Sequence, residues 1–106
     1  MNDKMLHEAH KSDIESIIAV EADVENTSFI IPNSKDEHFE LLVNKDVKYF
    51  ILKSNTGEML GFVILAGLEN KNRNIELRRI VIKQKGKGFG KKAIREIKHY
   101  CFEKLN

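Results

Sequence analysis

A stretch rich in glycine and lysine carries the residues of this chain that are best suited to chemistry. Residues 83–92, called the glycine loop below, read Lys-Gln-Lys-Gly-Lys-Gly-Phe-Gly-Lys-Lys. The β-branched apolar segment 75–82 before the loop predicts a buried strand, and the spacing of apolar residues over 93–101 predicts an amphipathic helix. The unpaired N–H groups of a helix's first turn point into such a loop, so this order of elements predicts a phosphate-binding site.

The charge distribution also favours an anionic ligand. Residues 1–70 contain 6 Lys/Arg and 13 Asp/Glu, whereas residues 71–106 contain 12 Lys/Arg and 3 Asp/Glu. Lys91 and Lys92 occupy the first turn of the predicted helix, where acidic residues are normally preferred, so a bound polyanion would relieve an unfavourable arrangement. The alternative is a basic face that interacts only with solvent.

Composition limits the other classes of function. A chain of 106 residues with 42% hydrophobic and 32% charged residues is expected to form one globular domain, residues 1–106. Cys101 is the only cysteine and lies on the apolar stripe of the last helix, which favours a core thiol over a nucleophile. The four histidines show no metal-binding spacing, and we predict no metal site. With no long apolar run or signal sequence, we expect a cytoplasmic protein without membrane contact.

The remaining pattern predicts the order β-α-α-β-β-β-α and an α/β fold with a mixed sheet. Capping-box patterns begin at Ser12 and Ser34 and predict two short helices, and Asn55-Thr56-Gly57 predicts a hairpin loop. The predicted strands are 5–9, 47–53, 58–68 and 75–82, and the last helix carries an apolar stripe with Phe89 anchoring its start.

Two familiar phosphate sites do not fit the glycine loop. No Gly-x-x-x-x-Gly-Lys-Ser/Thr pattern occurs, which excludes a Walker loop. Residues 88–93 satisfy Gly-x-Gly-x-x-Ala, but a dinucleotide-binding unit would place this motif after its first strand and continue to a further parallel strand.

The whole chain, and residues 84–90 in particular, instead resembles the GNAT superfamily of acyl-CoA-dependent N-acetyltransferases. The loop pattern of that family, Gln/Arg-x-x-Gly-x-Gly/Ala, corresponds here to Lys85, Gly88 and Gly90, with lysine at the first position. A lysine can still reach a phosphate as a point charge. Segment 75–82 likewise resembles the strand that precedes the loop in family members.

The resemblance implies that the chain binds acetyl-CoA as co-substrate and transfers its acetyl group to an amine of a small molecule or protein. Backbone N–H groups near residues 78–80 would face the acetyl oxygen. Glu76 is the candidate base that removes the amine proton, and the alternative is that it only pairs with Arg78. The residues implied in coenzyme binding are Ile80, Val81 and Ile82 for the pantetheine arm, Lys85 for phosphate, and Gly86, Lys87, Gly88, Phe89, Gly90 and Lys91 for the pyrophosphate.

The chain departs from the family pattern after the predicted last helix. Family members continue with a fifth strand and a tyrosine that protonates the leaving thiolate, and neither Tyr49 nor Tyr100 matches that position. The sequence is thus expected to be a fragment that is inactive alone, one that another chain completes, or a non-catalytic relative; pairing of exposed sheet edges in a homodimer is a further expectation. The rival function is a non-enzymatic module that binds nucleic acid or another polyanion through the loop and last helix. Nucleic acid is the less expected partner, because few aromatic residues accompany the basic ones.

Overall fold

Four antiparallel strands in chain order form the sheet in the part of the chain that the structure describes. The computed structural model describes residues 5–22, 34–69, 75–83 and 88–105. The strands are β1 (Leu6–Glu8), β2 (Val47–Lys53), β3 (Met59–Ala66) and β4 (Glu76–Ile82), in the order β1-β2-β3-β4. β3 is buried along almost its whole length. Its position inside the sheet explains its nearly continuous apolar sequence.

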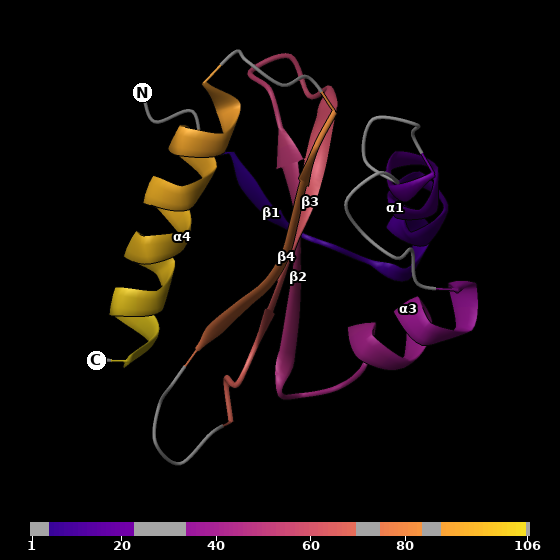
Figure 1. Cartoon of the computed structure of the whole chain (residues 1–106), viewed down its shortest axis with the longest axis horizontal. Helices are drawn as coiled ribbons and strands as arrows, with labels where there is room; N and C mark the ends of the chain where they lie inside the picture. The colour runs from indigo at the N-terminus through magenta and orange to yellow at the C-terminus, as the bar shows by residue number, and fades with distance from the viewer. Residues whose placement is uncertain (1–4, 23–33, 70–74, 84–87, 106) are drawn as a thin grey trace.

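Helices cover both faces of the sheet (Figure 1). A single 3-10 turn, Lys11–Asp13, leads into α1 (Ile14–Glu21), which lies with α3 (Lys35–Leu42) on one face. The longer α4 (Phe89–Leu105) lies on the other face. This order confirms the predicted α/β fold and its sequence of elements. The sheet was expected to be mixed, yet all three described pairings are antiparallel, because apolar patterning reveals strands without revealing their direction.

Among the described residues the core consists of two hydrophobic clusters, one on each face of the sheet. The strand residues of each cluster alternate along the chain, as the pleat of a strand requires. The cluster under α1 and α3 contains Ile14, Ile17, Val20, Val47, Tyr49, Ile51, Phe62, Ile64, Ala66 and Val81. The cluster under α4 contains Met5, Leu6, Phe50, Leu52, Leu60, Val63, Leu65, Ala93 and Ile97, with Phe89 and Cys101 packed against it.

One of the two predicted capping boxes is present. The Ser34 hydroxyl accepts a hydrogen bond from the Glu37 N–H (3.2 Å), and the Glu37 carboxylate accepts one from the Ser34 N–H (2.7 Å). The box predicted at Ser12 is wrong. The chain enters α1 through the 3-10 turn, in which the Asp13 carboxylate accepts from the His10 N–H (2.8 Å).

The hairpin between β2 and β3 turns where the sequence predicts it. Gly57 has φ +87°, in the left-handed region that glycine adopts without strain. The turn is closed by the Ser54 N–H, which donates to the Glu58 carbonyl (2.9 Å). In Figure 1 this hairpin lies at the same end of the sheet as the start of α4.

Candidate functional site

The start of α4 leaves backbone N–H groups without acceptors inside the helix. Gly88 has φ +77°, and its carbonyl accepts the first backbone hydrogen bond of α4, from the Lys92 N–H (3.3 Å). The N–H groups of residues 89–91 therefore precede the first N–H that donates within the helix, and they have no intrahelical acceptor. The predicted coenzyme contacts Lys85, Gly86 and Lys87 lie outside the described residues.

Open space lies beside the two described glycines of the glycine loop. A Cβ atom built on Gly88 or Gly90 would meet no atom of the described chain within 4 Å. The positive φ of Gly88 explains why glycine is used there, whereas Gly90 is helical and its own chain would tolerate a side chain. Nothing in the described chain thus requires a glycine at position 90.

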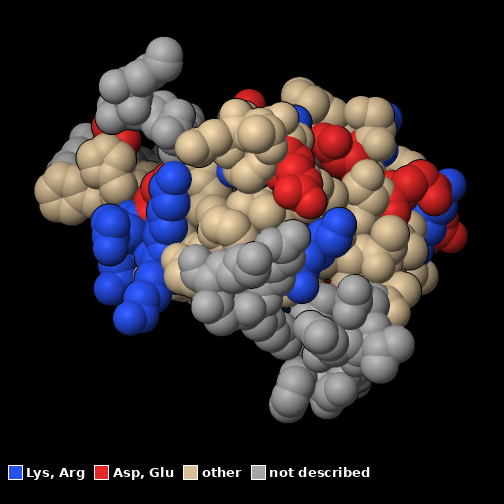
Figure 2. Space-filling view, turned by 90° about the horizontal axis from the view of Figure 1, so that it is seen from above, with Lys and Arg blue, Asp and Glu red and all other residues tan. Residues whose placement is uncertain are grey.

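Positive charge accumulates beside this space. Lys91 and Lys92 are exposed in the first turn of α4, which contains no acidic residue. Arg95 and Lys98 extend the exposed basic surface along the helix. In Figure 2 lysine and arginine side chains gather at the side of the molecule where α4 lies, and acidic side chains gather elsewhere. Phe89 is half-buried in the core under α4, which confirms its predicted anchoring role.

The outer edge of β4 offers backbone groups for a ligand. β4 is the last strand of the described sheet, and the Lys83 N–H donates to the Leu60 carbonyl of β3 (2.7 Å). Backbone groups of successive strand residues alternate in direction, so those of Ile80 and Ile82 face away from β3. Val81 has its backbone toward β3 and its side chain buried in the cluster under α1 and α3.

A bulge interrupts β4 next to these groups. Ile64 lies opposite Arg79, while the next residue, Leu65, lies opposite Leu77, so Arg78 has no opposing residue. Residues directly opposite each other share a face of the sheet. Glu76, opposite Ala66, is therefore on the face of α1 and α3, the same face as Arg79.

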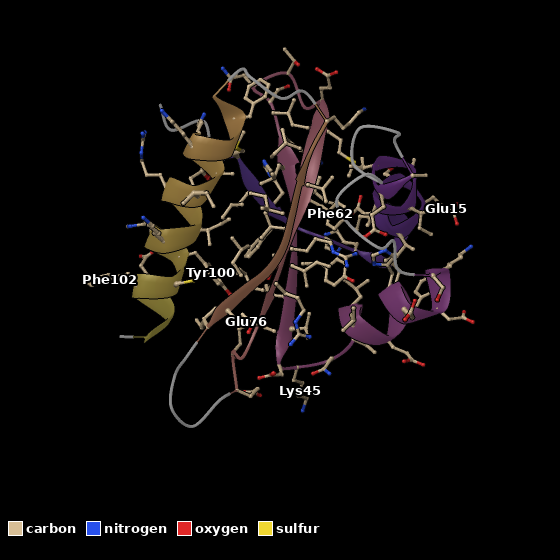
Figure 3. The ribbon with its side chains drawn as sticks, viewed as in Figure 1. Glu15, Lys45, Phe62, Glu76, Tyr100 and Phe102 are labelled. Carbon is tan, nitrogen blue, oxygen red and sulfur yellow. The ribbon has the colours of Figure 1, made fainter. Side chains whose placement is uncertain are left out.

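Glu76, the candidate base, is an exposed residue at the start of β4. Its carboxylate accepts a hydrogen bond from Arg78 Nε (3.4 Å), and both side chains are more than half exposed. Figure 3 places Glu76 at the end of β4 remote from the start of α4. The six steps from Glu76 to Ile82 span roughly 20 Å, so a ligand reaching from the glycine loop to Glu76 must be long and extended.

A buried polar network lies on the same face and was not predicted. It consists of Glu21, His38, Tyr49 and Arg79, called the Glu21 network below. His38 Nε2 lies 2.7 Å from Glu21 Oε1 and His38 Nδ1 lies 2.8 Å from the Tyr49 hydroxyl, while Arg79 pairs with Glu21 Oε2. Glu21 and His38 are 1% and 0% exposed. A carboxylate only accepts hydrogen bonds, so His38 donates from Nε2.

Electrostatics within the network stabilise an ionised carboxylate. Burial alone would raise the pKa of Glu21, but hydrogen bonds from His38 and Arg79 and their charges outweigh it and lower that pKa. Burial, together with the Glu21 charge, raises the pKa of the Tyr49 hydroxyl far above its ordinary value. The sequence signal for this network was the spacing of Glu21 after Ile14 and Ile17, which places a charged residue on the apolar stripe of its helix.

Cys101 and Tyr100 of α4 pack against the hydrophobic cluster under that helix. Burial raises the pKa of the Cys101 thiol, which agrees with a core role. Tyr100 packs edge-on against Phe50, with ring centroids 4.9 Å apart. Within the described ranges no group of three or more His, Cys, Asp or Glu could hold a metal ion, and no helix is long and apolar enough to cross a membrane.

Comparisons with known proteins identify a family and a shared fold. The sequence matches the model of the acetyltransferase (GNAT) family over residues 5–106. No curated protein matches the sequence. Similar solved structures include a chimera of the spermidine N-acetyltransferase SpeG from Vibrio cholerae and hSSAT, with a TM-score of 0.76, 24% identity and coverage of 97% of this chain and 65% of that one.

A second similar structure is the dodecameric spermidine N-acetyltransferase from Vibrio cholerae in an intermediate state. Its TM-score is 0.74 at 22% identity, over 95% of this chain and 63% of that chain. The chain thus spans less than two thirds of the length of either structure. At such identities the likeness shows a shared fold.

Proposed function

The chain belongs to the acetyltransferase (GNAT) family, and from this premise we propose that it binds acetyl-CoA and serves an N-acetyltransferase that moves the acetyl group to an amine. The observation that carries the proposal is the open space at Gly88 and Gly90, bordered by the first turn of α4 and by Lys91. Backbone N–H groups and a lysine suit a pyrophosphate, and the absence of side chains lets it approach.

The proposed coenzyme site continues from the glycine loop along β4. Residues 85–91 would hold the pyrophosphate, in agreement with the family pattern of this loop. The pantetheine arm, which carries amide groups, would pair with the outward backbone groups of Ile80 and Ile82 as an added strand. The side chain of Val81 would support this edge from the core. The arm would then run toward the bulge at Arg78 and toward Glu76.

The chemistry proposed at that end requires a neutral amine. The amine nitrogen forms a bond to the acetyl carbon, the carbon–sulfur bond breaks, and the sulfur leaves as the thiolate. Glu76 would accept the proton that the amine loses, directly or through water. The outward N–H of Ile80 would donate to the acetyl oxygen as negative charge develops on it.

The amine acceptor is proposed only as a class. The similar structures are named as spermidine N-acetyltransferases, which are enzymes that act on an amine, but their identity to this chain is too low to transfer the substrate. We also propose that the outer edge of β4 is covered in the working protein, either by further strands or by a second copy, because an uncovered edge invites uncontrolled pairing.

The test is a comparison of ligands by thermal unfolding and calorimetric titration. Acetyl-CoA and CoA should both raise the melting temperature of the full chain, since a ligand that binds only the folded state stabilises it. Dephospho-CoA and a single-stranded oligonucleotide at the same salt concentration provide the comparison. No stabilisation at millimolar acetyl-CoA would refute the proposal, and stabilisation by the oligonucleotide alone would favour the rival polyanion function.

A further inference from the structure

The Glu21 network joins one row of side chains across the sheet. Tyr49 of β2 lies opposite Ile64 of β3, and Ile64 lies opposite Arg79 of β4. Two strand spacings, roughly 10 Å, separate Tyr49 from Arg79, so these two side chains are connected only through a bridge of other residues. His38 from α3 and Glu21 from the end of α1 form it.

β4 is weakly attached to the core at this face. β2 and β3 each contribute three buried side chains to the cluster under α1 and α3, whereas β4 contributes only Val81. Arg79 is the next residue of β4 on the same face, and its side chain is 19% exposed. Beyond it the bulge begins and residues 76–78 are exposed. The bond from Arg79 to Glu21 is therefore the last attachment of β4 to this core before the bulge.

We propose that the Glu21 network is a positioning device that holds β4 in register at Arg79, and so fixes where the bulge begins and how Ile80 and Glu76 face the reacting groups. The inference rests on the proposed function for its catalytic meaning. The structural part of the inference, that the network keeps β4 in register, does not depend on that function.

The chemistry of the network suits this role better than a general contribution to stability. A buried ion pair often adds little net stability compared with apolar residues of the same volume, but it requires one particular geometry. Glu21 is held through both oxygens, by His38 and by Arg79, so the position of the guanidinium follows from two helices at once. A change of register at Arg79 would bury a carboxylate without its partner, which is costly.

The competing explanation is that the network only docks α1 and α3 on the sheet. The two explanations differ in what weakens when the network is damaged. Loss of a docking contact should loosen α1 and α3 and leave β4 as protected as β2. Loss of a positioning contact should loosen β4 selectively.

The experiment measures amide hydrogen exchange and acetyl-CoA affinity in the full chain. Tyr49→Phe removes one hydroxyl, and Arg79→Lys keeps the charge but loses the planar guanidinium. Ile17→Val is the control, because it removes buried volume beside the network without touching a polar partner. If Glu21→Gln folds, it serves as a third network variant. If it does not fold, Tyr49→Phe is enough to decide the test, because it removes only one hydroxyl.

In each network variant, the exchange rate of the β4 amides should rise about tenfold more than that of the β2 amides. In Ile17→Val the exchange rates of the two strands should change by the same factor. Acetyl-CoA affinity should fall further in the network variants than in the control. Equal changes in β4 and β2, or selective loosening of α1 and α3, would overturn the inference. If the parent chain does not bind acetyl-CoA, the proposed function fails, and the exchange result still decides the role of the network.

Discussion

The carbonyl oxygen of Val81 occupies the place where a side chain on Gly61 would begin. Gly61 of β3 lies opposite Ile82, and a Cβ atom built on it would overlap the Val81 carbonyl. The obstacle is backbone, which cannot rotate away as a side chain can. This glycine therefore lets β4 approach β3 beside the outward groups of Ile80 and Ile82.

Gly61→Ala should destabilise the protein by on the order of 1–3 kcal/mol, because β4 must move to admit the methyl group. The same displacement should weaken acetyl-CoA binding. Gly57→Ala is a matched control, since it costs about 1–2 kcal/mol through its positive φ alone and its Cβ would meet no atom within 4 Å. Chemical denaturation and calorimetric titration of both variants make the comparison. If Gly61→Ala binds the coenzyme as Gly57→Ala does, the edge of β4 is not the binding edge.

The two described glycines of the glycine loop should respond oppositely in stability. Gly88→Ala places a side chain at φ +77° and should cost about 1–2 kcal/mol. Gly90→Ala lies in a helix with free space around it and should stabilise the fold by up to about 0.5–1 kcal/mol. Both should weaken CoA binding, about tenfold for each charge-assisted hydrogen bond lost to the added methyl group. If Gly90→Ala were more stable than the parent and bound CoA with unchanged affinity, the pyrophosphate would not bind beside Gly90.

Local sequence signals predicted most of the fold. The capping box at Ser34, the hairpin glycine at 57 and the anchoring of Phe89 each depend on neighbouring residues, and each is confirmed. Ser12 offered the same capping pattern and was wrong, because its helix starts through a 3-10 turn whose geometry depends on what precedes it. The boundaries of β2 were predicted to the residue.

Features that depend on pairing between distant segments could not be predicted in this way. The bulge at Arg78 follows from how β4 aligns with β3, and it decides which face Glu76 occupies. The Glu21 network draws one residue from each of four elements. Glu21 and His38 each stood on an apolar helical face, but nothing local indicated that they would meet.

The acid stability of the protein should depend on Glu21. Its pKa is lowered in the folded state from a value of 4.5, so the folded protein binds fewer protons than the unfolded chain as the pH falls below 4.5. The contribution of Glu21 to the free energy of unfolding is therefore fully present above that pH, and it is lost as the pH falls through the pKa of Glu21 in the folded state. The free-energy gap between the parent and Glu21→Gln should therefore narrow as the pH falls below about 4.5.

Urea denaturation at a series of pH values measures this gap. Ile17→Val serves as the control, because a lost methylene does not titrate and its gap should stay constant throughout. A gap for Glu21→Gln that stays equally constant down to pH 3 would show that the carboxylate is not held ionised by His38 and Arg79.

Replacement of Glu76 should separate catalysis from binding. Glu76→Gln keeps the size and the hydrogen-bonding capacity of the side chain but removes its ability to take a proton. Because Glu76 is exposed and its pair with Arg78 is 3.4 Å long, the fold should lose little, in the range of about 0–1 kcal/mol for exposed pairs. Acetyl-CoA affinity should also be unchanged, since the coenzyme is held at the other end of β4. The turnover number should fall about 10²- to 10⁴-fold, the usual contribution of a general base.

Release of the free CoA thiol gives the turnover number, measured over a panel of primary amines at saturating acetyl-CoA in the form of the protein whose outer β4 edge is covered. Glu40→Gln provides a control with the same chemical change on the exposed surface of α3. If Glu76→Gln retained the parent rate while Arg78 kept its geometry, Glu76 would be only the partner of Arg78. The base would then have to be sought among the other groups on the face of α1 and α3.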